Sequence, residues 1–322
     1  MPTVSTVLIA LVTSAATALA SATAAAERLH FDSAARTTDN ALIFQGRTAY
    51  TDHIHGELQL PSQGAAPFPA VVIMHSSRGI GSTIREWARL FNDMGIATFV
   101  VDSFGPRGLQ ETTADRLDLS VGVVDSLRAL QALQQDRRID SKRIGAIGFS
   151  RGAIAVMGAS FERYRHSVLG HDAGAKFAWH IVFYGGCAQY ARTTGSPILT
   201  FLGTEDDFTH VSVCRKDAEI LNQQGTKTEL VVYDGALHGF DTDYPYQWMP
   251  AYPNFKNCRM LLNLDTFDAI LADGRALSAG ERADYYKTCS SPGSARGGNP
   301  KYAAAARERV KLFVDEQLKL PR

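Results

Sequence analysis

Short segments that are apolar throughout alternate with amphipathic ones, and this alternation constrains the fold most. Between residues 69 and 233 the apolar segments read PAVVIMH, IATFVVD, IGAIGF, HIVFY, PILTFLG and ELVVY. Strands that are apolar on both faces are typical of a mostly parallel sheet with helices covering both sides. Apolar residues at helical spacing predict those helices, over residues 83–95, 121–133, 153–160, 218–224 and 303–318. The fold class is therefore α/β.

Two weaker local signals add detail at the edges of this pattern. Residues 41–61 alternate loosely and predict antiparallel strands near a sheet edge, where His53 and His55 share one strand face. Two histidines without a further ligand nearby favour ordinary surface residues over a metal site, and no metal is predicted. Thr83 and Glu86 have the spacing of a capping box at the start of a helix.

The ends and the overall charge of the chain bear on its location and partners. The chain has 322 residues, with 33 basic and 33 acidic side chains, and this balance argues against a nucleic-acid partner. Residues 1–26 read as a signal peptide, with an apolar stretch, then small residues, and cleavage near Ala26. The apolar stretch is short for a membrane span, so no stable membrane anchor is expected. We expect a periplasmic or secreted protein, with residues 27–322 forming one domain of undetermined oligomeric state.

Four cysteines lie in the second half of the chain. An even number in an exported protein predicts disulfides, and three pairings are possible. The pairs that close the shortest loops are Cys187–Cys214 and Cys258–Cys289. Buried free thiols are the alternative if the chain is not exported, and the spacings do not match a zinc site.

Residues 241–300 interrupt the alternation before the last helix. This stretch begins with aromatic and proline-rich sequence and ends in the loop SSPGSARGGNP. A segment of this length between two regular elements is usually functional or disordered, and a Cys258–Cys289 bond would make it a stapled insertion and a candidate lid. Its aromatic residues either roof a pocket or form a small core of their own, and they are Tyr244, Tyr246, Trp248 and Tyr252.

The motif GFSRG at 148–152 carries the clearest chemical signal. Ser150 follows an apolar strand and directly precedes a helical segment, which is the context of a nucleophile elbow. The flanking glycines, Gly148 and Gly152, leave space for a sharp turn that exposes the serine hydroxyl. A serine needs a base, and the base needs an orienting acid.

Both partners follow later strands in the order Ser–Asp–His. The acid is predicted at Asp206, after PILTFLG, with Asp207 as a structural neighbour. The base is predicted at His238, in the loop after ELVVY, and His210 is a rival because it lies close to Asp206 in sequence. Histidine suits this role because its usual pKa lies near neutrality.

Acyl transfer also requires hydrogen-bond donors for the developing oxyanion. One is predicted to be the backbone N–H of Arg151, which follows the nucleophile. The other comes from HSSRG at 75–79, the loop after the first buried strand, with the N–H of Ser77 preferred and that of Ser76 second.

Six segments together resemble the dienelactone hydrolase family of the α/β-hydrolase superfamily: HSSRG, VDSFGPRG, GFSRGA, YGGC, GTEDDFTHVSVC and LHGFD. The resemblance covers residues 40–242 and the last helix. It implies an α/β-hydrolase fold of about eight strands and hydrolysis of esters or lactones without a cofactor. It also implies that Ser150, Asp206 and His238 form the triad, and it supports the Cys187–Cys214 bond, since exported relatives have cysteines at these places.

The chain also departs from the family. The namesake enzymes have a cysteine nucleophile, are cytoplasmic and lack a long insertion such as 241–300, so their substrate is not carried over. Arg78, Arg107 and Trp248 are candidate substrate contacts, although a loop ion pair is favoured for Arg107.

The function predicted from the sequence is therefore an exported serine hydrolase of a small-molecule or polymeric ester or lactone. A serine peptidase of the prolyl-oligopeptidase kind is one alternative, but no acidic pair is clearly placed to anchor a peptide terminus. A non-catalytic binding protein with the same fold is another, and the intact Ser–Asp–His order counts against it.

Overall fold

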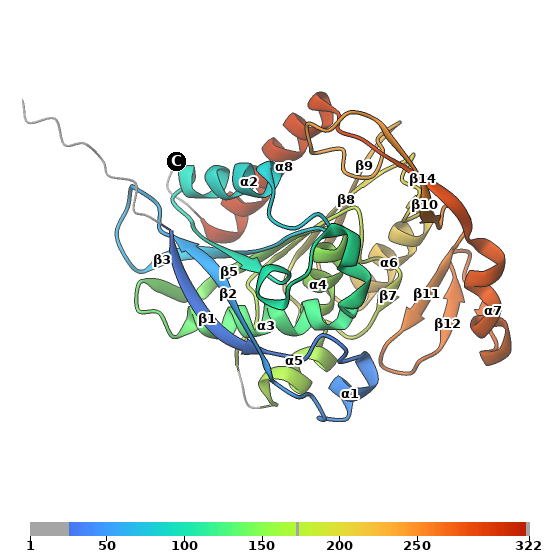
Figure 1. Ribbon diagram of the computed structural model, residues 1–322, viewed down its shortest axis with the longest axis horizontal. Coiled ribbons are helices and arrows are strands. Elements are labelled where there is room, and N and C mark those ends of the chain that lie inside the picture. The colour runs from blue at the N-terminus through green and yellow to red at the C-terminus, as the bar shows by residue number, and fades with distance from the viewer. Residues whose placement is uncertain (1–25, 172–173, 320–322) are drawn as a thin grey trace, which may run out of the picture.

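An eight-stranded sheet forms the centre of the part of the chain that the computed structural model describes, residues 26–171 and 174–319 (Figure 1). The strand order is β1–β2–β4–β3–β5–β6–β8–β9. β2 is antiparallel to β1 and β4, and the remaining neighbours are parallel. The strands are β1 (Glu27–Ser33), β2 (Asp52–Gln59), β3 (Phe68–Met74), β4 (Ala97–Asp102), β5 (Ile139–Phe149), β6 (His180–Phe183), β8 (Ile198–Gly203) and β9 (Thr228–Tyr233).

Helices cover both faces of this sheet. In Figure 1, α2 (Ser82–Asp93) and α8 (Pro300–Leu318) lie on one face, while α3 (Leu119–Gln134), α4 (Arg151–Ala159) and α5 (Glu162–Leu169) pack together on the other. The parallel strands place their carboxyl ends at one edge, where the loops that carry functional residues meet. The other helical segments are α1 (Asn40–Phe44), α6 (Val211–Gln223), α7 (Ala279–Cys289) and the 3₁₀ turns η1 (Gly105–Arg107) and η2 (Glu111–Arg116). The fold is the mostly parallel α/β-hydrolase arrangement that the alternation and the resemblance predict.

The N-terminal region differs from the prediction in two places. Residues 41–61 do not form strands throughout, because α1 occupies the start, where Asp39 caps the helix by accepting a hydrogen bond from the N–H of Leu42 (2.9 Å). The edge strand β1, which pairs with β2, was not predicted. The predicted capping box of Thr83 and Glu86 is also wrong, since α2 begins at Ser82 after an extended Gly81 that makes no side-chain cap.

Residues 241–300 form a substructure beside the carboxyl edge of the sheet (Figure 1). β10 (Gln247–Asn254) pairs with β14 (Ser291–Arg296). A second small sheet has the order β13–β12–β11–β7, so the insertion pairs with a strand of the core, β7 (Gln189–Tyr190). The other strands of this sheet are β11 (Met260–Asn263), β12 (Ala269–Leu271) and β13 (Ala276–Leu277).

Both disulfides favoured by the shortest-loop argument are present. Cys187 is bonded to Cys214, and Cys258 is bonded to Cys289. The first joins the segment after β6 to α6, and the second closes the insertion onto the last residue of α7. Within the described ranges no helix is long and apolar enough to cross a membrane. Most of the predicted signal peptide, residues 1–25, lies outside the described residues.

The two histidines weighed as metal ligands lie on β2, where His53 is exposed and His55 is partly buried. His53 contacts Asp32 through Nδ1 and Oδ1 at 2.5 Å, and its side chain is largely exposed. His55 lies 3.9 Å from Asp102. Each histidine thus lies near a single carboxylate.

His180, at the start of β6, makes the stability of the fold depend on pH. It is completely buried, and burial lowers its pKa from 6.5 to about 3. The unfolded chain therefore binds a proton below pH 6.5 that the folded chain does not bind until about pH 3. The contribution is fully present above the unfolded pKa and is lost progressively as the pH falls toward the folded pKa.

We expect His180→Phe to remove this dependence. Both ring nitrogens lack a hydrogen-bond partner among the described residues, so no partner is orphaned by the change. Between pH 7.5 and pH 5, the wild type should lose about 2 kcal/mol more unfolding free energy than the variant. Urea denaturation at the two pH values measures this, and equal losses in both proteins would contradict it.

Candidate active site

Ser150 lies in a sharp turn between β5 and α4. Its backbone has φ 52° and ψ −111°, a conformation that a residue with a side chain rarely adopts. A Cβ atom on Gly148 would lie 2.0 Å from the carbonyl oxygen of Gly152, and one on Gly152 would lie 2.1 Å from that of Met74. Only glycine fits at either position, and the helix and strands close tightly around the exposed hydroxyl.

His238 connects Ser150 to a carboxylate. It lies in the loop after β9, with Nε2 2.9 Å from Ser150 Oγ and Nδ1 2.9 Å from Asp206 Oδ2. A carboxylate accepts, so Nδ1–H donates to Asp206 and Nε2 is left to accept the serine proton. The imidazole also packs against two aromatic rings: its ring centre lies 4.4 Å from that of Phe208 and 4.8 Å from that of Tyr184.

The acid loop after β8 gives its two aspartates different partners. Asp206 is buried, and its Oδ1 accepts from the N–H groups of Phe208 (2.8 Å) and Thr209 (3.0 Å). Asp207 instead accepts the N–H of Ala295 (2.8 Å) through Oδ2 and thereby fixes the insertion to the core. The rival His210 caps α6, where its Nδ1 accepts the N–H of Ser212 (3.0 Å). The hydrogen-bonded chain that includes Ser150 thus runs through Asp206.

The two predicted oxyanion donors are available. Among the described residues, neither the N–H of Ser77 nor that of Arg151 donates to a protein acceptor. His75 holds the peptide between Ser76 and Ser77, because its Nδ1–H donates to the Ser76 carbonyl (2.7 Å) while its Nε2 accepts the N–H of Ser103 (3.2 Å). Burial lowers the pKa of His75, so this imidazole remains neutral and keeps both hydrogen bonds.

A buried network that the sequence did not reveal supports the His238 loop. Asp241 accepts from the Tyr184 hydroxyl (2.7 Å) and from Trp87 Nε1 (2.8 Å). Burial raises the pKa of the Asp241 carboxyl, and these two hydrogen bonds partly offset the rise. Tyr184 has φ 43°, which turns the chain directly after β6. The motifs YGGC and LHGFD contain both residues, but nothing in their spacing indicates that they meet.

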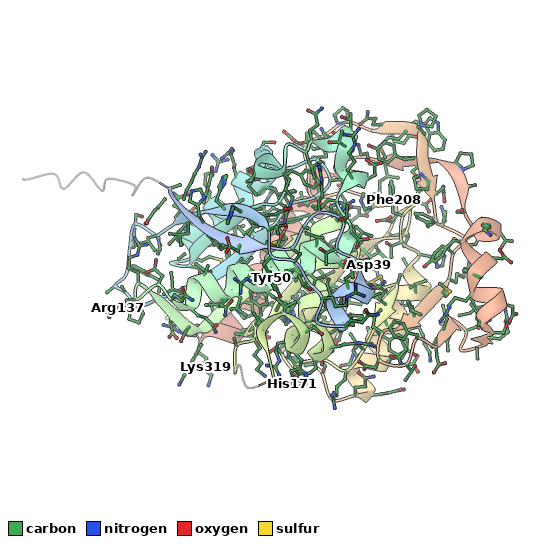
Figure 2. The ribbon with its side chains drawn as sticks, turned by 60° about the horizontal axis from the view of Figure 1, so that its bottom comes forward. Asp39, Tyr50, Arg137, His171, Phe208 and Lys319 are labelled. Carbon is green, nitrogen blue, oxygen red and sulfur yellow. A yellow bond between two sulfur atoms is a disulfide. The ribbon has the colours of Figure 1, made fainter. Side chains whose placement is uncertain are left out.

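Two cavities meet at Ser150 and His238. The larger has a volume of about 540 Å³ and extends toward the insertion. The smaller, of about 90 Å³, borders the HSSRG loop and includes Ser77 and Arg78. Phe208 borders both cavities, and Figure 2 shows it on the side of the core that faces the insertion.

The three candidate substrate contacts have different positions. Arg78 borders the small cavity and stacks on Tyr244, with Cζ 4.0 Å from the ring centre. Arg107 does not border either cavity: it forms a buried double hydrogen bond with Asp125 (2.8 and 2.9 Å) and another with Asp52 (2.7 Å). Arg107 thus makes the buried ion pairs that the second interpretation describes.

Trp248 is the candidate contact that the structure places elsewhere. Its side chain is 53% exposed and packs against Gly293, outside both cavities. Its neighbour Met249 borders the small cavity instead, because successive side chains of a strand point to opposite faces. Tyr244 and Tyr252 also border that cavity, so part of the aromatic cluster does line the site.

Comparison with known proteins identifies the family. The model of the dienelactone hydrolase family matches residues 54–258, well over half of the chain. A probable 2-oxo-3-(5-oxofuran-2-ylidene)propanoate lactonase from Bradyrhizobium sp is 22% identical in an alignment of 204 residues that covers 56% of this chain and 77% of the relative.

Two solved structures are also similar. An esterase from Thermogutta terrifontis with bound propionate is 17% identical and covers 58% of this chain and 80% of its own, with a TM-score of 0.48. The dienelactone hydrolase-like promiscuous phosphotriesterase P91 from metagenomic libraries is 20% identical, with a TM-score of 0.48. The match covers 68% of this chain and 85% of the P91 chain. By the match of its family model, the chain belongs to the dienelactone hydrolase family and is a carboxylic-ester or lactone hydrolase.

Proposed function

We propose that this hydrolase is an exported serine enzyme that works through a covalent acyl-enzyme. Ser150 is the nucleophile, His238 the general base and Asp206 the orienting acid. The observation that carries the proposal is the continuous hydrogen-bonded chain from Asp206 through His238 to Ser150, which opens into the two cavities. With Nδ1–H donating to Asp206, Nε2 of His238 is free to accept the proton of Ser150, which is the arrangement that general-base catalysis needs.

The reaction follows from these positions. Ser150 Oγ forms a bond to the ester carbonyl carbon while its proton passes to His238 Nε2, and Asp206 stabilises the imidazolium. The carbonyl oxygen becomes negative and is held by the N–H groups of Ser77 and Arg151. When the tetrahedral intermediate collapses, the alcohol leaves with the proton from Nε2. Water then attacks the acyl-enzyme, with His238 again as base, and releases the acid and free Ser150.

The proposal of export rests on two features. Residues 1–26 have the composition of a signal peptide, with cleavage near Ala26. The two disulfides fit an oxidising compartment such as the periplasm or the exterior. We further propose that residues 27–322 form one domain in which the insertion 241–300 roofs the site. The pairing of β11 with β7 and the hydrogen bond from Ala295 to Asp207 support this.

The substrate class includes both open-chain and cyclic esters. The relative from Bradyrhizobium is named as a lactonase. A lactone is an internal ester, so the same attack by Ser150 opens its ring and leaves the alcohol attached to the acid. The site needs neither a metal nor an organic cofactor for these steps, since the triad and the backbone donors supply every proton and charge contact.

Labelling with a fluorophosphonate probe tests this mechanism. We expect one covalent adduct per chain, located on the peptide that contains Ser150, because only an activated serine displaces fluoride from such a probe. Mass spectrometry of the digested protein locates the adduct, and Ser150→Ala should remain unlabelled. A native protein that neither labels nor hydrolyses any carboxylic ester would disprove the proposed function.

A further inference from the structure

We propose that the preferred substrate is an ester with an uncharged, apolar group of roughly six to twelve carbons on one side of the scissile bond, and that the large cavity binds this group. The inference rests on the proposed function and specifies its substrate class. The second group of the ester, small or polar, would then lie toward the small cavity.

The walls of the large cavity carry no formal charge. None of the described residues that line it is Asp, Glu, Lys or Arg. Apart from His238, the titratable imidazole in the wall is that of His210, whose pKa is lowered by burial and by the nearby cations Arg259 and Lys256. A carboxylate placed here would lose hydration without meeting a cationic side chain among the described residues of the wall. The cavity therefore favours neutral, apolar groups.

The insertion supplies a large part of this apolar surface. The cavity is lined by Phe255, Met260, Leu262 and Tyr286 of the insertion, together with core residues that include Ile154 and Val213. The family match ends at residue 258, so Met260, Leu262 and Tyr286 lie outside the segment shared with the family. The preference is thus a property of this chain's own insertion.

The cavity walls are also cross-linked, which keeps the cavity open before substrate binds. Cys258 lines the cavity and is bonded to Cys289, and the Cys187–Cys214 bond ties the segment after Gly186 to α6 beside Val213. The N–H of Leu262 donates to the carbonyl of Ala188 (3.0 Å), and Figure 1 shows β7, β11 and α6 close together. A preformed cavity costs little ordering on binding, so buried apolar area contributes directly to affinity.

The volume sets the size of the group. About 540 Å³ is available, and each water-sized unit takes about 30 Å³ of liquid volume. A chain of about ten heavy atoms therefore fits with space remaining. The small cavity differs from the large one in size, at about 90 Å³. It also differs in chemistry, because its lining includes Arg78 and the ion pair between Arg296 and Glu111 (2.7 Å).

Two series of neutral esters test the inference. One lengthens the acyl chain from methyl acetate to methyl octanoate, and the other lengthens the alcohol from methyl acetate to octyl acetate, each followed by acid release at constant pH. In the series whose variable group enters the cavity, kcat/KM should rise about threefold to fourfold per added methylene. The series that shows the rise identifies the side of the ester that is bound. A flat profile in both series, beside normal fluorophosphonate labelling, would overturn the inference and leave the proposed function standing.

A charged analogue and a pair of variants sharpen the test. A carboxylate at the far end of the favoured chain should lower kcat/KM at least 100-fold, and equal rates would contradict the inference. Leu262→Trp should narrow the cavity and weaken the increase at the longer chain lengths, whereas Trp248→Ala, on the exposed face of the same insertion, should keep it. The charged analogue decides the matter in the wild type even if Leu262→Trp does not fold. Absence of both labelling and turnover would instead reject the proposed function and this inference together.

Discussion

Replacing Ser150 with alanine is expected to lower kcat for a short ester about 10⁶-fold. The change removes the oxygen that lies 2.9 Å from His238 Nε2 and with it the covalent route. Residual turnover should come from the free N–H groups of Ser77 and Arg151, which still polarise a bound carbonyl. Steady-state rates with p-nitrophenyl butyrate, beside a thermal unfolding curve for each protein, measure the effect.

Ser150→Cys separates a nucleophilic role from a structural one. A thiol at the same strained turn keeps the packing around Gly148 and Gly152, and His238 can deprotonate it. We expect this variant to retain activity on activated esters and to become sensitive to iodoacetamide. If Ser150→Ala kept more than a tenth of the wild-type rate, Ser150 would not be the nucleophile.

The geometry around Ser150 was predictable because parallel strands place their carboxyl ends at one edge. The loops after β5, β8 and β9 carry Ser150, Asp206 and His238, and strand order alone brings them near each other. The glycines of the elbow were also predictable, since each side chain they lack would meet a backbone carbonyl. Local sequence was sufficient to predict these residues because the order of the strands in the sheet determines which loops lie next to each other.

The remaining features depend on contacts that local sequence does not encode. The insertion is held beside the large cavity by the pairing of β11 with β7, two strands separated in the chain by the acid loop and β9. Arg107 finds its partners Asp52 and Asp125 at separations of 55 and 18 residues in the chain. The capping box at Thr83 failed because α2 begins one residue earlier than expected, at Ser82, so Thr83 lies within the first turn with its side chain buried and is not the cap.

Asp206→Asn is expected to lower kcat about 10⁴-fold. Asp206 Oδ1 accepts two backbone N–H groups, from Phe208 and Thr209, so the amide oxygen of asparagine would occupy that position. The NH₂ group of the asparagine would then face His238 Nδ1, and Nδ1 would have to accept a hydrogen bond from it instead of donating one. The proton would be displaced to Nε2, and the imidazole could no longer take the proton of Ser150. The same steady-state assay measures the loss, and fluorophosphonate labelling should slow in parallel.

Asp207→Asn is the matched control, one residue away in the same buried loop. The carboxylate of Asp207 accepts the N–H of Ala295 through Oδ2, and the amide oxygen of asparagine can take its place. We therefore expect kcat to change less than tenfold while the insertion stays attached. If Asp207→Asn lost the activity and Asp206→Asn kept it, the acid would have to be reassigned to Asp207. A large loss in both variants with lowered melting temperatures would instead show that the loop acts only by holding the fold, because the tautomer argument applies to Asp206 alone.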